Sequence, residues 1–308
     1  MPQKVRCNLC GADDHKVLYN IPSAGAEEEA ANYAITDHST SIPPRIVKCR
    51  KCGLIYANPR PSPVRLVSNY TEMVDHLYLE EEEGRRISAR SILKVLKKMG
   101  KAGRLLDIGC ATGFLLDEAR KEGWDVYGID LSKWAIDYAK NKLGLKNIFQ
   151  GALVRAKYQD DFFDVVIMKD VIEHLTDPKG TLEEIRRILK PGGIVCVNTP
   201  NIASLTSKVL GARWWGVKQA HLYYFTWYYI FWGSLHKMLH QAGFIPLRTK
   251  SHVRAFTFKY WVNQFKSYSR IIYRILVFLM EKLRLENRLL RIDLGDQIEV
   301  YAAKPGAK

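Results

Sequence analysis

Residues 104–116 read Arg-Leu-Leu-Asp-Ile-Gly-Cys-Ala-Thr-Gly-Phe-Leu-Leu, and this stretch carries the strongest indication of the fold of the 308-residue chain. Its apolar start predicts a buried strand, and Gly109 and Gly113 predict a tight turn into a helix. Glycines in such a turn let a ligand approach the backbone, and the free N–H groups of the helix face that ligand. Asp107, near the end of the strand, would repel a pyrophosphate. We therefore expect a neutral or cationic ligand rather than a dinucleotide.

Apolar runs and helical patterns alternate along the chain on both sides of this turn. Strands are expected at residues 104–108, 125–129, 146–149, 163–168, 193–197, 244–250 and 297–302, and helices at 87–99, 114–121, 133–143 and 181–189. Strands with helices between them form parallel sheets. The sequence thus predicts an α/β fold with a doubly wound, Rossmann-like sheet of seven strands.

Changes in composition divide the chain into five segments. We expect a module with two closely spaced cysteine pairs, typical of a zinc ribbon, at 1–60, a linker and cap helix at 61–103, a ligand-binding core at 104–255, a basic amphipathic helical insertion at 256–292, and the last strand and tail at 293–308. The first boundary follows a cluster of prolines, which cannot continue a helix or an inner strand.

Three further blocks follow the glycine turn. Asp130 ends the second strand, where this fold normally binds a ribose diol. Residues 163–175, Phe-Asp-Val-Val-Ile-Met-Lys-Asp-Val-Ile-Glu-His-Leu, cover the fourth strand, and residues 189–195, Leu-Lys-Pro-Gly-Gly-Ile-Val, introduce the fifth. With these blocks in this order, residues 105–244 resemble the class I S-adenosylmethionine-dependent methyltransferases.

The resemblance implies S-adenosylmethionine as the cofactor and assigns its binding residues. Asp107 and the turn from Gly109 to Gly113 would hold the methionine portion, and Asp130 the ribose hydroxyls. The full expected set is Asp107, Gly109, Cys110, Ala111, Gly113, Asp130, Leu131, Gly151, Ala152, Lys169 and Asp170. Ala111 stands where relatives usually carry a glycine, and we expect its φ to be negative.

Four cysteines form two Cys-x-x-Cys pairs, Cys7 with Cys10 and Cys49 with Cys52, and each pair is followed by a glycine. Four thiolates favour tetrahedral Zn²⁺ with no open coordination position, so we expect a structural zinc site. The 38 residues between the pairs predict a long loop at about 25–41. A redox dithiol is the alternative, but no thioredoxin-like βαβ pattern surrounds either pair.

The cysteine pairs, the following methyltransferase domain and the run His221-Leu-Tyr-Tyr-Phe are together similar to zinc-containing methyltransferases of bacterial glycan-biosynthesis clusters. They are also similar to the front part of the deoxysugar C-methyltransferases. Those enzymes carry Tyr, Glu and His before the Tyr-Phe pair, and here Lys218 and Ala220 occupy the first two places. We therefore expect O-methylation of a sugar, glycan or lipid-linked small molecule, with C-methylation of a nucleotide sugar as an alternative.

Two histidines are candidate general bases for a hydroxyl acceptor, because an imidazole titrates near neutral pH. His221 and His174 both follow strands, at the edge of the sheet where such folds bind ligands. Alternatively, His221 has a structural role and makes a buried hydrogen bond beneath the neighbouring aromatic side chains. The structural alternative for His174 is that it orients its own loop. Tyr70 and Tyr78 precede the helix that caps the site in relatives, and they could line its methionine end.

The chain carries 47 Lys and Arg against 32 Asp and Glu, a net charge of +15 that favours a polyanionic partner. An RNA methyltransferase is one alternative, although the block after the fourth strand lacks the Asn-Pro-Pro-Tyr type of motif of base-amino methylases. Nucleic acid is therefore the less expected partner. Two tight cysteine pairs and the absence of a signal-like start predict a reducing compartment, the cytoplasm.

The segment 256–292 combines an apolar stripe with basic residues. Lys266, Arg270 and Arg274 recur every four residues, which on a single helix places them on one face. Such a helix either packs on the sheet domain or a second subunit, or lies on an anionic membrane surface. The second alternative would place the protein at the inner face of the membrane.

Overall fold

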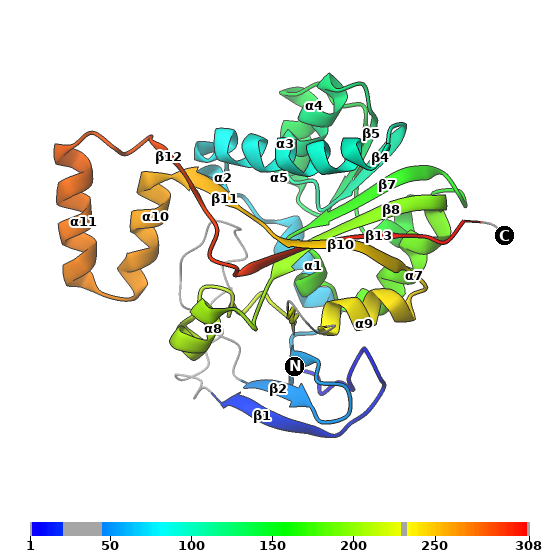
Figure 1. The fold of residues 1–308 in the computed structure, drawn as a ribbon, viewed down its shortest axis with the longest axis horizontal. Coiled ribbons are helices and arrows are strands. Elements are labelled where there is room, and N and C mark those ends of the chain that lie inside the picture. The colour runs from blue at the N-terminus through cyan, green and yellow to red at the C-terminus, as the bar shows by residue number, and fades with distance from the viewer. Residues whose placement is uncertain (1, 21–44, 229–232, 307–308) are drawn as a thin grey trace.

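The computed structural model describes residues 2–20, 45–228 and 233–306, and a central sheet with helices on both faces dominates it (Figure 1). The strands of this sheet are, in spatial order, β10 (Ile245–Ser251), β13 (Gln297–Ala303), β8 (Leu189–Pro200), β7 (Phe163–Lys169), β4 (Arg104–Ile108), β5 (Asp125–Asp130) and β6 (Asn147–Gln150). β13 runs antiparallel to both of its neighbours, whereas the pairs from β8 to β6 are all parallel. The doubly wound α/β fold with seven strands is confirmed.

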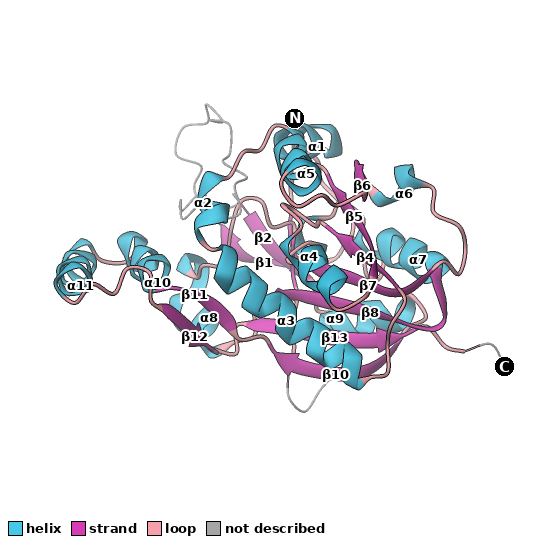
Figure 2. Ribbon diagram, turned by 90° about the horizontal axis from the view of Figure 1, so that it is seen from above, coloured by secondary structure: helices cyan, strands magenta, loops and turns pink. Residues whose placement is uncertain are grey.

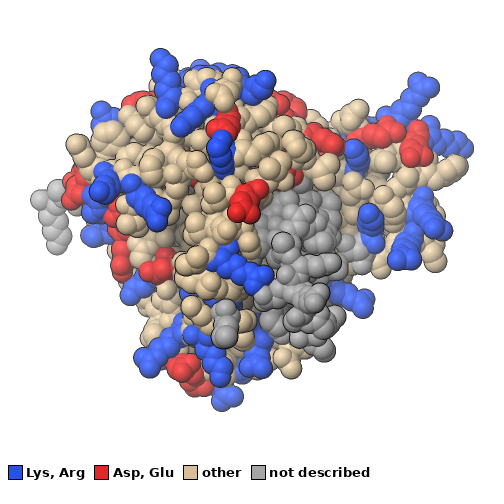
Figure 3. Space-filling view, turned by 180° about the vertical axis from the view of Figure 1, so that it is seen from behind, with Lys and Arg blue, Asp and Glu red and all other residues tan. Residues whose placement is uncertain are grey.

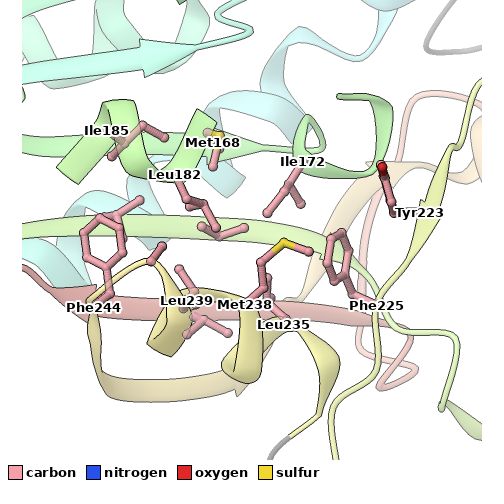
Figure 4. Packing of buried hydrophobic residues seen from close by; sticks show 14 of the residues in the cluster. Met168, Ile172, Leu182, Ile185, Tyr223, Phe225, Leu235, Met238, Leu239 and Phe244 are labelled. Carbon is pink, nitrogen blue, oxygen red and sulfur yellow. The ribbon is translucent and has the colours of Figure 1, made fainter. Parts of the chain in front are cut away.

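Two layers of helices cover the sheet because successive side chains of each strand point to opposite faces. Leu105 and Val165 pack with α3 (Glu82–Lys98), α4 (Phe114–Lys121) and α5 (Lys133–Asn141). Leu106 and Val166 pack on the other face with α7 (Pro178–Ile188) and α9 (Ser234–Gln241). Figure 2 shows the sheet between the two layers, and Figure 4 shows the side chains of α7 and α9 meeting over β7 and β8.

Capping side chains determine where several helices begin. Ser132 accepts a hydrogen bond from Ala135 N at the start of α5, the position that the sequence predicted. Asp177 caps α7 through Gly180 N, and Pro178 occupies the first turn, so this helix begins three residues before the predicted residue 181. Short helices complete this part of the chain: α6 (Leu153–Ala156), η1 (Ile172–His174), α8 (Leu205–Leu210) and η2 (Gly211–Arg213).

A second, four-stranded sheet contains the cysteine pairs. Its strands are β1 (His15–Asn20), β2 (Arg45–Cys49), β3 (Ile55–Ala57) and β9 (Tyr223–Tyr224). The fourth strand, β9, comes from the methyltransferase-like region and pairs with β3, so the N-terminal sheet is continuous with residues far beyond the predicted boundary at 60. Helices α1 (Pro63–Thr71) and α2 (His76–Glu80) then lead to α3. The predicted loop at 25–41 lies outside the described residues.

The segment 256–292 is not the single long helix that we expected. It forms an arm with β11 (Arg254–Thr257), α10 (Phe258–Gln264), η3 (Phe265–Ser267), α11 (Arg270–Lys282) and β12 (Leu289–Ile292). β11 and β12 pair antiparallel, which brings the two ends of the arm together. Lys266 precedes Ser269, the N-cap of α11, and so does not share a helix with Arg270 and Arg274. In the described residues, no helix is both long and apolar enough to cross a bilayer.

Candidate active site

The turn after β4 holds three residues in the left-handed region. φ is +74° at Gly109, +45° at Ala111 and +83° at Gly113. The expectation that Ala111 has a negative φ is therefore wrong, and its conformation costs about 1 kcal/mol relative to glycine. Part of this cost is offset by a 2.8 Å hydrogen bond from Ala111 N to Asp130 Oδ2. A Cβ at Gly109 would lie 2.4 Å from Val171 Cγ2, so only glycine fits there.

Asp107 lies beneath this turn and is 4% exposed. Among the described residues, none donates a hydrogen bond to its carboxylate. Burial first, and the Asp130 carboxylate second, raise the pKa of Asp107 to about 8, while Lys169 opposes this shift. A buried carboxylate without a donor favours an incoming cationic group. Asp107 thus fits the ammonium of the cofactor's methionine portion.

Asp130 ends β5 beside the turn. Its Oδ1 accepts from Ser132 N and its Oδ2 from Ala111 N, both at 2.8 Å, which fixes the orientation of the carboxylate. Burial raises the pKa of Asp130, although these backbone donors act in the opposite direction. Each carboxylate oxygen has a second lone pair, so the two oxygens can accept from two vicinal hydroxyls. This is the donor pattern of a ribose diol.

The other predicted cofactor residues surround these two acids. Gly151 N donates to Asp130 O at 2.8 Å, which places Gly151 next to Asp130. Leu131 directly follows Asp130 in the chain. Ala152 is exposed and caps the short helix α6. Cys110 is buried, and burial raises the pKa of its thiol well above the usual value, so it is not a nucleophile.

Lys169 and Asp170 form an ion pair at the end of β7, with 2.6 Å between Lys169 Nζ and Asp170 Oδ2. Gln297 Nε2 donates to the other carboxylate oxygen at 3.0 Å. Burial acts to raise the pKa of Asp170, but the charge and hydrogen bond of Lys169, together with the charges of His252 and Arg85, lower it overall. Asp170 also has a positive φ of +55°, a strained conformation that directs its side chain towards these partners.

The two candidate bases lie together. The ring centroids of His174 and His221 are 4.7 Å apart, and Glu173 completes a group in which one ligand atom of each residue lies within 4.8 Å of the others. His221 Nδ1 lies 2.7 Å from Gly216 O, and His174 Nδ1 lies 3.0 Å from Ala220 O. Both Nδ1 atoms therefore carry the proton, and both Nε2 atoms keep a lone pair.

The protonation of this group differs from the simple expectation of a base titrating near neutral pH. Burial lowers the pKa of His174 to about 4, and burial together with His174 lowers the pKa of His221 well below 6.5. Burial and then Asp170 raise the pKa of Glu173 to about 8. At neutral pH both imidazoles are uncharged and can accept a proton or bind a metal ion.

Two contributors to the site were not predicted from the sequence. Glu173 received no role, yet it is 1% exposed and accepts a 2.9 Å hydrogen bond from Thr199 Oγ1. Arg85 stacks on the Tyr78 ring, with 3.4 Å between its guanidinium carbon and the ring centroid. Tyr70 does reach the site, since its hydroxyl lies 2.7 Å from His174 Nδ1. Glu173 could have been predicted, because it directly precedes the candidate base His174 in the sequence.

The four cysteines of the N-terminal sheet also converge. Cys7 Sγ lies 3.4 Å from Cys52 Sγ, and Cys10 Sγ lies 3.6 Å from Cys49 Sγ, with all four sulfur atoms within 4.8 Å of one another. Tetrahedral Zn²⁺ with Zn–S bonds of about 2.3 Å separates its sulfur ligands by about 3.8 Å. The cluster fits one such ion. The described cysteines form no disulfide.

Comparison with known proteins places residues 79–248 in a family described as a methyltransferase domain. A ubiquinone biosynthesis O-methyltransferase of Cereibacter sphaeroides is 34% identical over 163 residues, which cover 49% of this chain and 63% of the relative. An uncharacterized methyltransferase of Schizosaccharomyces pombe is 30% identical over 149 residues, 44% of this chain and 53% of the relative. The chain thus spans less than two thirds of the length of these relatives.

Among solved structures, a SAM-dependent methyltransferase from Archaeoglobus fulgidus is 20% identical, with a TM-score of 0.47 over 75% of this chain and all of the other. The family match covers more than half of the 308 residues, so the chain belongs to the methyltransferase-domain family and is of the class I S-adenosylmethionine-dependent type. The match begins in α2 and ends in β10, and therefore excludes both the cysteine cluster and the arm.

Proposed function

We propose that the protein O-methylates a hydroxyl of a sugar, glycan or lipid-linked small molecule, with His221 as the general base. One observation carries the proposal: the uncharged imidazoles of His221 and His174 meet at the same edge of the sheet as Asp107 and Lys169. The bacterial relatives are named as O-methyltransferases of ubiquinone biosynthesis, which supports a hydroxyl acceptor.

S-adenosylmethionine, when bound, supplies a methyl group activated by its sulfonium charge. Asp107 holds the cofactor's ammonium, and Asp130 holds its ribose hydroxyls. His221 Nε2 removes the proton of the acceptor hydroxyl. The Nδ1–H group of His221 keeps its hydrogen bond to Gly216 O throughout, which holds the ring in place. The imidazolium that forms is stabilised by the negative charge of Asp170, the carboxylate that acts against burial to raise the pKa of His221. His174 packs edge-on against His221 and positions it.

We propose a structural role for one Zn²⁺ on Cys7, Cys10, Cys49 and Cys52. All four positions of a tetrahedral ion are then filled by thiolates, so no position is open for a substrate. The sheet that carries these cysteines ends on β9, two residues after His221. The metal therefore stabilises the scaffold of the catalytic loop and does not enter the reaction.

Methyl transfer from labelled S-adenosylmethionine to a panel of acceptors tests the proposal. The panel contains nucleotide sugars, lipid-linked glycans, an intermediate of ubiquinone biosynthesis, and total tRNA and rRNA. We expect an acid-stable labelled methyl group on a hydroxyl oxygen of one of the small molecules. This labelling should depend on His221. Label found only on RNA, or on a sugar carbon, would replace the proposal with one of the two alternatives from the sequence.

A further inference from the structure

The arm formed by β11, α10, α11 and β12 stands out from the body of the protein (Figure 1). Its base is fixed to the core: Thr257 N and Oγ1 both donate to the Glu81 carboxylate, and Arg254 Nη2 donates to Asp296 Oδ2 at 2.7 Å. Arg254 and Asp296 are both buried, so the base cannot detach without breaking a buried ion pair. The arm is therefore held in one direction relative to the sheet.

Helix α11 presents an apolar surface to solvent. Its inner face consists of Tyr273, Leu276, Val277 and Met280, of which only Met280 is fully buried. On the opposite face, Ile271 is 73%, Ile275 is 55% and Phe278 is 61% exposed, and Ile272, Leu279 and Leu283 extend this surface. These side chains recur at helical spacing, so they form one continuous stripe. A contiguous exposed stripe of this kind marks an interaction surface.

Basic residues accompany the stripe. The segment 256–292 carries eight Lys and Arg against two Glu, a net charge of +6. Arg270 and Arg274 are exposed at one edge of the stripe, and no carboxylate of the described residues lies within 4.0 Å of either guanidinium. Lys282 lies on the outer face beside Phe278, with 5.9 Å between its Nζ and the ring centroid. Figure 3 shows basic side chains distributed over the arm.

We propose that α11 binds the surface of an anionic membrane, with Ile271, Ile275 and Phe278 in the headgroup boundary and Arg270 and Arg274 on lipid phosphates. A helix of 13 residues is about 20 Å long and cannot span the hydrocarbon core, so it lies in the plane of the interface. The net charge of +6 favours anionic lipid over a second copy of the chain, because two arms packed through α11 would repel each other. The base of the arm lies at the carboxyl edge of the sheet, because Arg254 pairs with Asp296, which directly precedes Gln297, the residue opposite Pro200 at the end of β8. A membrane bound by the arm would therefore lie on the side of the candidate site.

Sedimentation of the full chain with vesicles tests this surface independently of any methyl transfer. One vesicle is phosphatidylcholine alone, and the other mixes phosphatidylcholine with phosphatidylglycerol. We expect binding to the anionic vesicle only, and about tenfold weaker binding when NaCl rises from about 50 mM to about 500 mM. No binding to the anionic vesicle, or equal binding to both, overturns the proposal.

Two variants and a matched control sharpen the test. The triple variant Ile271→Ser, Ile275→Ser, Phe278→Ser and the double variant Arg270→Glu, Arg274→Glu should each lose vesicle binding and keep the melting temperature. Val154→Ser removes an equally exposed apolar side chain from α6 and should bind like the unaltered protein. Wild-type binding by either arm variant overturns the proposal. So does a lipid-free dimer, detected by light scattering, that the triple variant converts to monomer.

Discussion

The imidazole rings of His174 and His221 lie edge to face, with 4.7 Å between their centroids and 78° between their planes. The two residues are 47 positions apart, and each donates its Nδ1 proton to a backbone carbonyl of the segment 216–220. This arrangement fixes one tautomer for both rings and directs both Nε2 lone pairs away from the backbone. Burial lowers the pKa values of both histidines because neither ring has a carboxylate within hydrogen-bond distance to stabilise its charged form.

Replacing His221 by Asn should lower kcat on a hydroxyl acceptor by about a hundredfold or more, because the general base is lost. The Asn amide can still donate to Gly216 O, so the loop should keep its conformation. Affinity for S-adenosylmethionine, measured by calorimetry, should stay within about twofold. His240→Asn, an exposed histidine on α9, serves as the control. An unchanged kcat for His221→Asn would return this residue to a packing role.

The pH profile should reflect the lowered histidine pKa. A base with the ordinary value of about 6.5 would lose half of its activity at that pH. Because burial and His174 hold the pKa of His221 well below this value, kcat at saturating substrates should be flat from pH 8 to about 6 and fall only in more acidic solution. A midpoint near 6.5 in the kcat profile would contradict the buried, uncharged ring.

Asp107 should link cofactor binding to proton release. Its pKa of about 8 in the free protein means that the carboxyl is mostly protonated at pH 7, whereas an ammonium ligand requires the carboxylate. Affinity for S-adenosylmethionine should therefore rise with pH up to about 8, with release of up to about one proton at pH 7. Calorimetry in buffers of different ionisation enthalpy measures this release, and Asp107→Asn should abolish it.

Asp130→Ala should weaken cofactor binding by about 2 to 3 kcal/mol, because a two-oxygen, charge-assisted contact with the ribose is lost. Asp125→Ala removes an exposed carboxylate from the other end of β5 and is the matched control. Calorimetry measures both variants, and their melting temperatures show whether the turn at Ala111 survives. Failure of the unaltered protein to bind S-adenosylmethionine or its demethylated product would refute the cofactor assignment.

Cys49→Ser should eliminate the one zinc ion expected per chain, measured by elemental analysis, and unfold the N-terminal sheet. The central sheet should persist, but kcat should fall as well, because Ala57 N donates to Leu222 O directly after His221. Cofactor affinity should change far less than kcat. Cys196→Ala, in the middle of β8, should keep its zinc. Full metal content in Cys49→Ser would refute the site.

The sequence determined the architecture of the sheet domain. Short apolar runs, the glycine turn before Phe114 and the helical pattern of residues 133–143 are local signals, and each depends on residues close together in the chain. The cysteine cluster was likewise predictable from local sequence, because the short spacing within each of the two cysteine pairs indicates a metal site. Sequence placed Asp107 and Asp130 at the ends of neighbouring strands for the same reason.

Features that depend on contacts between distant segments are set by the tertiary structure. The pairing of β3 with β9 joins the cysteine sheet to the loop of His221, and no local pattern signals that pairing. Desolvation, which lowers the pKa of His221 and raises that of Glu173, exists only once the chain is packed. The arm shows the same limit: helical periodicity was present over 256–292, but the β11–β12 pairing that closes it needs residues 254 and 292 side by side. Periodicity is a local property, whereas pairing and burial are properties of the whole fold.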